Sequence, residues 1–201
     1  VMRSYCNLGL DFYYKSDYKT GVEYSEKAIA GCQKIGDEAL LAESYRNAAS
    51  NHLFFAPDST KGTHTKPGVS AQRTKALAYL DKALEIAKRL PMAPVEIARI
   101  ENWRGNVLKY LLRNEDALAA YIDARKWFQQ AGSRRGNNIT AANIAHIYIN
   151  TERYEQALPI MLEVIDANEK SGDSLNLVEQ YQLVGQIYEN LNDYKNGLDY
   201  F

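Results

Sequence analysis

The sequence predicts an all-α fold, an α-solenoid made of repeated antiparallel helix hairpins. The first observation is internal repetition: the ending "VGQIYENLNDYKNGLDYF" aligns without a gap on "IAHIYINTERYEQALPIM" at 144–161. The second observation is that apolar residues recur at the spacing of amphipathic helices, as at Leu80 and Leu84 or Leu118 and Ile122. Almost no segment alternates as a β-strand would, so helices are expected throughout.

Small residues mark the repeats in three series of positions. The first series, spaced by 40, 56, 40 and 40 residues, comprises Gly9, Ala49, Gly105, Ala145 and Gly185. The second follows twelve residues later, or 27 in the second copy, and comprises Gly21, Ala76, Ala117, Ala157 and Gly197. The third follows after seven more and comprises Ala28, Ala83, Ala124 and Val164. Small side chains let helix axes approach closely, and twelve residues lead around a tight turn onto the next helix. Each copy is therefore predicted to be one hairpin.

These series predict one domain over 1–201, with repeats at roughly 1–37, 38–92, 93–133, 134–173 and 174–201, the last one incomplete. The longer interval in the second repeat leaves an excess from Pro57 to Ala71 that is rich in Gly, Pro, Ser and Thr. This composition predicts a loop insertion at 57–71, with Ser70 as the N-cap of the next helix. The insertion is either a mobile segment or a partner contact.

The repeats resemble a known family. The segments "NIAHIYINTERYEQALPIM" and "LVGQIYENLNDYKNGLDYF" carry a small residue, an aromatic residue, a turn aromatic and two further small positions in the order of the tetratricopeptide repeat (TPR). The match is weaker in the second copy, where His52 and Arg73 occupy slots that are usually aromatic. The period of about 40 exceeds the usual 34 and resembles an extended subclass. That subclass occurs in kinesin light chains, bacterial peptide-sensing regulators and sensory arms of bacterial signalling proteins.

The resemblance implies a right-handed superhelix of TPR-like hairpins whose first helices line a concave peptide-binding groove. Carried over by position, the groove residues are Arg46, Ser50, Arg99, Asn102, Asn106, Lys109, Tyr110, His146, Asn150, Gln182 and Gln186. Side-chain amides pair with both groups of a peptide main chain, and Arg can clamp a carboxylate, so this composition suits a polypeptide ligand. The alternative at each position is an ordinary polar helix face. Most of the fifteen Tyr are assigned to packing and not to an aromatic binding site.

The predicted function is a non-catalytic scaffold that binds a protein or peptide, as the sensory or interaction segment of a larger signalling protein. Two alternatives remain open: the regulatory arm of a diguanylate cyclase or histidine kinase whose catalytic domain lies outside these residues, or a structural oligomerisation module. The three His form no triad with Asp, Ser or Cys, and metal-ligand spacing and nucleotide-binding motifs are absent. No catalytic residue, cofactor or metal is therefore predicted.

Charge and hydropathy limit the classes of partner and the location that the sequence predicts. The 24 basic and 25 acidic residues leave a net charge of −1, which argues against nucleic acid and anionic membranes. No apolar run is long enough to span a membrane and no signal peptide opens these residues, so a cytoplasmic location is favoured over a periplasmic one.

An uncovered apolar stripe containing Leu198 and Phe201 predicts self-association at the C-terminal end. Cys6 and Cys32 are expected to be free, half-buried thiols, because the hairpin separates them by about 10 Å along its axis.

Overall fold

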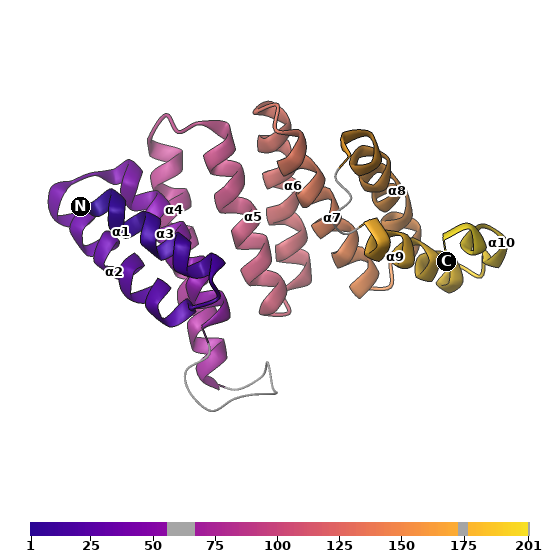
Figure 1. The fold of residues 1–201 in the computed structure, drawn as a ribbon, viewed down its shortest axis with the longest axis horizontal. Helices are drawn as coiled ribbons and strands as arrows, with labels where there is room; N and C mark the ends of the chain where they lie inside the picture. Colours follow the sequence, from indigo (N-terminus) through magenta and orange to yellow (C-terminus); the bar gives the residue numbers. More distant parts are fainter. Residues whose placement is uncertain (56–66, 173–176, 201) are drawn as a thin grey trace. The chain divides into compact units, whose positions relative to one another are not determined.

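The computed structural model describes residues 1–55, 67–172 and 177–200, and every regular element in these ranges is helical (Figure 1). The elements in chain order are α1 (Met2–Tyr14), α2 (Tyr18–Ile35), α3 (Glu38–Phe54), α4 (Pro67–Arg89), α5 (Pro94–Tyr110), α6 (Asn114–Gln130), α7 (Arg134–Asn150), α8 (Tyr154–Ser171), α9 (Leu177–Asn190), α10 (Tyr194–Gly197) and the 3-10 helix η1 (Leu198–Tyr200). The all-α prediction is confirmed.

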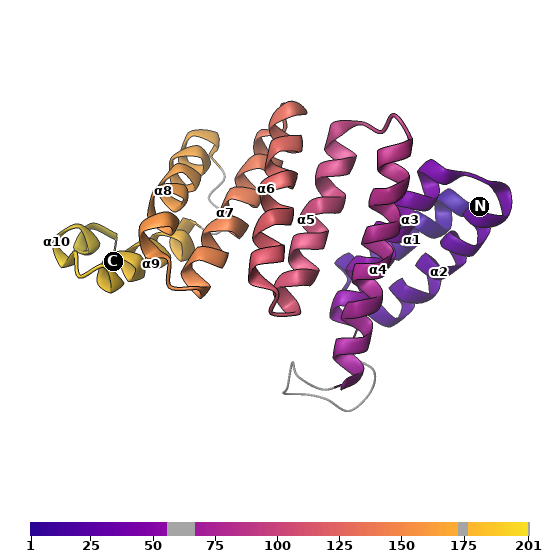
Figure 2. The same cartoon turned by 180° about the vertical axis from the view of Figure 1, so that it is seen from behind.

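The chain forms two compact units, unit 1 (Val1–Ala120) and unit 2 (Tyr121–Phe201). In unit 1 each of the first four helices packs against the next along the chain, from α1 against α2 to α4 against α5. The first helices of successive hairpins also touch, α1 with α3 and α3 with α5. Figure 2 shows α4 on the near side of this layer, against α3. In unit 2, α8 packs against both α7 and α9, and α9 packs against α10 and η1.

The turns of the hairpins share one backbone conformation. A non-glycine residue with φ between 58° and 60° lies in the turn of four hairpins: Ser16, Leu112, Glu152 and Asn192. The next N–H then donates to a carbonyl five residues back, as in Arg113 to Leu108 at 3.0 Å and Arg153 to Tyr148 at 2.8 Å. This geometry resembles the helix-terminating motif that normally uses Gly. It reverses the chain within three residues, which places the two helices of a hairpin side by side.

The small residues of the first two series are buried throughout. A Cβ atom on Gly9 would lie 2.3 Å from Ser25 Oγ, and one on Gly21 would lie 2.0 Å from Asn51 Oδ1. Asn51 in turn donates to Gly9 O at 2.9 Å, and Asn47 donates to Cys6 O at 3.2 Å. Because these contacts leave no space for a methyl group, the small residues set the distances between α1, α2 and α3.

Each unit has its own apolar core. The core of unit 1 includes Ile29, Tyr45, Leu53, Leu80, Ile86, Ile100 and Val107, packed around Ala42, Ala48, Ala49, Ala76, Ala83 and Ala87. The core of unit 2 comprises Ala145, Ala157, Met161, Ile165, Val184 and Ile187. A smaller cluster in unit 1 holds Cys6, Ala28, Cys32 and Leu40. Both cysteines are free, as predicted, although they are fully buried where half-buried thiols were expected.

The two polar residues in aromatic slots of the second repeat are buried and bonded. His52 Nε2 donates to Glu26 Oε1 at 3.2 Å, and its Nδ1 lies 2.6 Å from Gln72 Oε1. Glu26 also accepts hydrogen bonds from Lys75 at 2.8 Å and from Tyr79 at 2.7 Å. The hydrogen bond from His52, followed by those from Lys75 and Tyr79, outweighs burial and lowers the pKa of Glu26 from 4.5 to about 2. This network joins α2, α3 and α4.

The predicted boundary of the insertion is wrong at its C-terminal side. Helix α4 begins at Pro67, so residues 67–71 are helical and do not belong to a loop. Ser70 lies inside this helix, where its carbonyl accepts a hydrogen bond from Thr74 Oγ1 at 3.0 Å, and it is therefore not the N-cap. The physical reason is that Pro has a backbone angle suited to the first turn of a helix. The rest of the predicted insertion, 57–66, lies outside the described residues.

We expect Gly21→Ala to lower the free energy of unfolding by about 1–3 kcal/mol, because the added methyl group forces apart the packed α2 and α3. Urea unfolding followed by circular dichroism measures the change. Lys19→Ala, at an exposed position in the same helical turn, is the control and should change stability by less than about 0.5 kcal/mol. An unfolding midpoint of the Gly21 variant equal to or above that of the wild type would contradict the close approach.

We expect the hydrogen bonds to Glu26 to make the folding stability depend on pH in the acidic range. The folded pKa of about 2 lies below the ordinary 4.5, so the carboxylate stabilises the fold above pH 4.5 and this contribution is lost as the pH falls toward 2. Melting temperatures of the wild type and Glu26→Gln should therefore differ most near neutral pH and converge toward pH 2. A difference that stayed constant over this range would show that the Glu26 charge contributes nothing.

Candidate functional site

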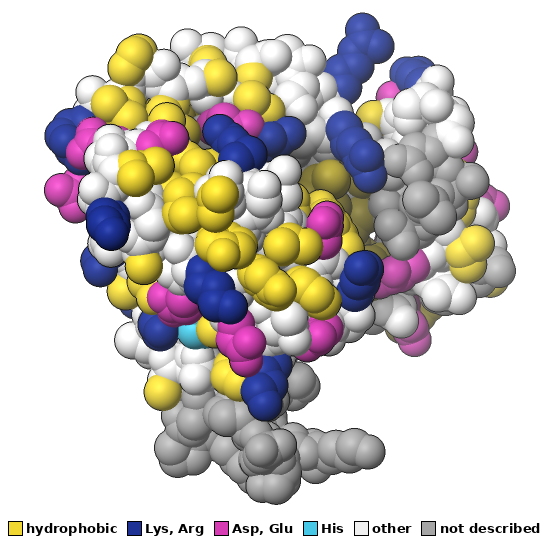
Figure 3. All heavy atoms as spheres, turned by 60° about the vertical axis from the view of Figure 1, so that its left-hand side comes forward, with side chains coloured by type: hydrophobic (Ala, Val, Ile, Leu, Met, Phe, Trp, Pro, Cys, Tyr) yellow, Lys and Arg dark blue, Asp and Glu magenta, His cyan; other side chains and the backbone are white. Residues whose placement is uncertain are grey.

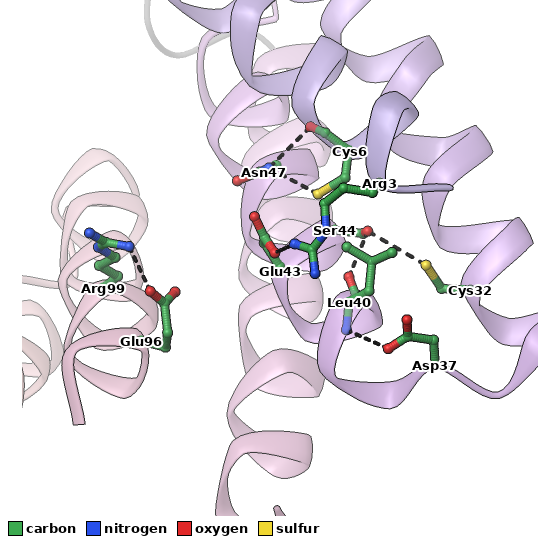
Figure 4. Close-up of polar contacts among 10 residues, drawn as sticks. All are labelled: Arg3, Cys6, Cys32, Asp37, Leu40, Glu43, Ser44, Asn47, Glu96 and Arg99. Carbon is green, nitrogen blue, oxygen red and sulfur yellow. Dashed lines mark hydrogen bonds and ion pairs between the residues drawn. The ribbon is translucent and has the colours of Figure 1, made fainter. Parts of the chain in front are cut away.

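In unit 1 the first helices of the successive hairpins, α1, α3 and α5, share one face. Residues at equivalent positions of the repeat contact one another from helix to helix. Arg3 on α1 forms an ion pair with Glu43 on α3, and both residues precede their first-series small residue by six positions (Figure 4). Arg99 holds the same position on α5, where Figure 4 shows it paired with Glu96 of its own helix at 2.6 Å. Residues at the same position of successive repeats thus lie on the same face of these helices.

The predicted groove residues of unit 1 are on α3 and α5, and they differ in exposure. Arg99 is exposed, whereas Arg46, Asn102 and Asn106 are partly buried. Ser50 is only 1% exposed, and its Oγ donates to Asn47 O at 2.8 Å. The prediction for Ser50 is corrected accordingly: this hydroxyl is part of the packing and not of an open surface. The reason is that α3 has neighbours on four sides, α1, α2, α4 and α5.

Six aromatic side chains gather on unit 1, and we call this cluster the aromatic surface: Tyr13, Tyr14, Tyr18, Phe54, Trp103 and Tyr110. The Tyr13 ring is central, with its centroid 5.4 Å from Trp103, 5.9 Å from Tyr18 and 6.1 Å from Phe54. Phe54 also lies 5.6 Å from Tyr110. Four helices, α1, α2, α3 and α5, therefore contribute to one group of rings.

The aromatic surface is only partly covered. Tyr14 is 74% exposed, and the other five rings are partly buried. Burial among the neighbouring tyrosines raises the pKa of Tyr13 to about 12. Figure 3 brings the N-terminal side of unit 1 forward and shows hydrophobic side chains gathered on it between basic and acidic ones. The assignment of most tyrosines to packing missed this cluster. Its sequence signal is that Tyr14, Phe54 and Tyr110 each follow a first-series small residue by five positions.

Two cations border the rings. The guanidinium of Arg73 lies 5.1 Å from the Tyr110 ring and donates to Tyr110 O at 3.0 Å. Lys109 Nζ lies 5.7 Å from the centroid of the same ring. Burial lowers the pKa of Lys109, because partial removal from water disfavours the ammonium ion. Within the described residues Lys109 forms no ion pair with a carboxylate.

Unit 2 contains a pocket of about 950 Å³ between α7, α8 and α9. His146 of the predicted groove lines it, while Asn150, Gln182 and Gln186 lie on the same two first helices, exposed, and outside its lining. Met161, Val164 and Leu183 provide apolar lining. The predicted site residues thus belong to both units, Arg46 to Tyr110 in unit 1 and His146 to Gln186 in unit 2.

Polar groups in the pocket are largely bonded to one another. Asn138 donates to Asn168 at 2.7 Å, and Asn168 donates to Gln180 at 3.0 Å, so one amide chain crosses α7, α8 and α9. Of the lining carboxylates, Glu163 pairs with Arg125 at 2.5 Å and Asp166 pairs with Lys170 at 2.7 Å. The pocket therefore presents amides and balanced charges to any ligand.

In the described part of the chain, no group of three or more His, Cys, Asp or Glu side chains is placed to hold a metal ion. Nor does any of its helices combine the length and apolar character that crossing a bilayer requires.

Residues 140–171, within the α7–α8 hairpin, match the family model of the tetratricopeptide repeat. No curated protein sequence matches the chain. Among solved structures, the apo form of RapI gives a TM-score of 0.81 at 16% identity, covering 99% of this chain and 67% of that chain. A Rap protein complexed with Competence and Sporulation Factor gives 0.74 at 15% identity, covering 98% and 50%. A putative kinesin light chain with nearly identical TPR-like repeats, from Podosopora anserina, gives 0.75 at 12% identity, covering 99% and 90%.

Helix hairpins that pack through small residues place the chain among the all-α repeat proteins. The match within α7–α8, and the likeness of fold to TPR-like structures over nearly the whole chain, identify the repeat itself. Residues 140–171 therefore form a tetratricopeptide repeat, and the chain as a whole shares the fold of TPR-like structures. The matched family model describes a structural repeat and indicates no catalytic activity.

Proposed function

We propose that the chain is a non-catalytic module that binds another polypeptide through the shared face of α1, α3 and α5 in unit 1. The observation that carries the proposal is that equivalent positions of these helices touch, as in the Arg3–Glu43 pair and the Phe54–Tyr110 ring contact. Side chains from three helices therefore form one extended surface. In unit 2, His146, Asn150, Gln182 and Gln186 are proposed to contribute further contacts from α7 and α9.

The chemistry of this face supports a polypeptide ligand. Asn102 and Asn106 on α5 carry amides that can both donate to and accept from a peptide main chain. Arg46 and Arg99 can bind carboxylates through two parallel hydrogen bonds. One of the structural neighbours is described as a Rap protein in complex with Competence and Sporulation Factor, and another as a Rap regulator in complex with the Phr* peptide. Because this chain spans about half of those proteins, their activities are not assigned to it.

The wider setting that we propose is a sensory or interaction segment of a larger bacterial signalling protein in the cytoplasm. An alternative is a regulatory arm of a diguanylate cyclase or histidine kinase whose catalytic domain lies elsewhere. The full-length gene sequence distinguishes these two settings at once. Nucleic acid is not proposed as the partner, because the net charge of −1 provides no electrostatic attraction to phosphate.

We expect Asn106→Ala and Arg99→Ala to lower affinity for a partner captured from native lysate by about tenfold or more. Removing either side chain leaves a polar group of the partner unpaired, which costs about 1–3 kcal/mol. Isothermal titration calorimetry with the identified partner measures the change, after circular dichroism has verified that both variants fold.

The matched control is Lys126→Ala, which removes an exposed cation of α6 that pairs with Asp123 at 3.1 Å in its own helix. This variant should bind as the wild type does. Equal affinities for all three variants would place the partner elsewhere, with the unit 2 pocket as the next surface to test.

Self-association is a second candidate role, favoured by apolar exposure near the C-terminal end. Leu198 is 75% exposed and Tyr194 is 61% exposed, whereas Gly197 between them is buried against Tyr188. Phe201, the other member of the predicted stripe, lies outside the described residues. We expect sedimentation velocity to show a mass that rises with concentration, and Leu198→Asp to abolish the rise by placing a charge in the contact. A concentration-independent monomer mass for the wild type would exclude this role.

A further inference from the structure

We propose that the aromatic surface and Lys109 together bind a segment of a partner protein in which an acidic side chain lies next to a large apolar or aromatic one. This inference rests on the proposed function and specifies the chemistry of the partner. Two independent features of unit 1 carry it: a group of incompletely covered rings, and an ammonium ion at its border that pairs with no carboxylate in the described part of the chain.

The rings are suited to recognition because they are both positioned and accessible. Phe54, Trp103 and Tyr110 rest with one side on the unit 1 core. Tyr13 and Tyr14 extend the ring contacts beyond that core, with centroids 5.4 Å apart, and Tyr14 is largely exposed. Aromatic side chains bury a large area on binding and lose little conformational entropy, which makes such clusters effective anchors for an apolar side chain.

Lys109 provides the second feature. Its ammonium group contacts the ring of Tyr110 and is partly removed from water, yet it has no carboxylate partner among the described residues. Burial alone accounts for the lowered pKa of this lysine. A partly desolvated cation of this kind costs stability in the free protein. A carboxylate arriving from a partner would pair with it in surroundings where the interaction is stronger than in water.

The charge balance of the neighbouring helices favours an acidic partner over a basic one. Every carboxylate on α3 and α5 already has an arginine partner; the pairs are Glu38–Arg89, Glu43–Arg3, Glu96–Arg99 and Glu101–Arg104. Two cations of the same helices, Arg46 and Lys109, form no ion pair within the described residues. The uncompensated charge on α3 and α5 is therefore positive, although the whole chain carries a net charge of −1. Like charges would disfavour a basic segment here.

The test uses short random peptides displayed on phage and selected on the complete chain. Enriched peptides should carry Asp or Glu next to Phe, Tyr, Trp or Leu. A tryptophan-free member of that set is then titrated into the Trp127→Phe variant, in which Trp103 of the aromatic surface is the remaining tryptophan. We expect the Trp103 fluorescence to change on binding, because the peptide covers the ring.

A double-mutant cycle identifies the charge contact. Lys109→Gln, or replacing the peptide acid by its amide, should each lower affinity by about tenfold, and combining both changes should cost little more than either alone. Lys109→Arg should retain most of the affinity. The matched control is Lys82→Gln, which removes a cation of α4 that lies 5.6 Å from the ring of Tyr45 on α3. This variant should bind as the wild type does. Lys109→Gln should unfold no earlier than the wild type in urea.

The outcomes separate this inference from the proposed function. Additive effects in the cycle, or enriched peptides that lack acids, would overturn the inference. If such acid-free peptides still lost affinity with Asn106→Ala, the proposed binding face would stand. Selection of basic peptides would likewise overturn the inference. If the chain enriched no peptide, both this inference and peptide binding by the shared face would be contradicted.

Discussion

The close approach of helices at small residues is the constraint on which the other features of unit 1 depend. Gly9 and Gly21 leave no space for a Cβ atom, because Gly9 of α1 lies against the backbone of α2 and Gly21 of α2 lies against the Asn51 side chain of α3. At this distance Asn47 and Asn51 reach the carbonyls of α1 and satisfy buried polar groups that would otherwise be costly. The same packing brings equivalent positions of the first helices together, which makes a shared face possible.

The second repeat shows how the fold tolerates departures from the repeat pattern. His52 and Arg73 replace aromatic residues in buried slots, and each is retained by polar partners on neighbouring helices. Glu26 collects hydrogen bonds from three side chains, so a polar network joins α2, α3 and α4 alongside the apolar core. Lys109 differs, because its ammonium group is partly buried and pairs with no carboxylate of the residues that the structure describes. Local conflicts of this kind are expected at functional positions, where binding and not folding selects the side chain.

Periodicity predicted which position of the repeat a residue occupies better than it predicted how exposed that residue is. Ser50 and Asn106 follow a first-series small residue by one position each, yet Ser50 is buried and Asn106 is partly accessible. The difference arises because α3 packs against helices on four sides, which a repeat alignment does not report. Ser70 was expected to start a helix from its residue type, but α4 already begins at Pro67. Residue preference indicates a possible cap, whereas the preceding turn decides which residue occupies it.

The sequence by itself determined the fold class and the hairpin units, because helical periodicity and small residues are local signals that repeat along the chain. It also indicated which helix carries Lys109 and Tyr110. Only the tertiary structure decided that Tyr13, Tyr18, Phe54 and Trp103 form one surface with Tyr110, since these rings come from four helices. Which cations lack a carboxylate was also decided there, because pairing depends on distances between side chains of different helices, such as Arg3 and Glu43.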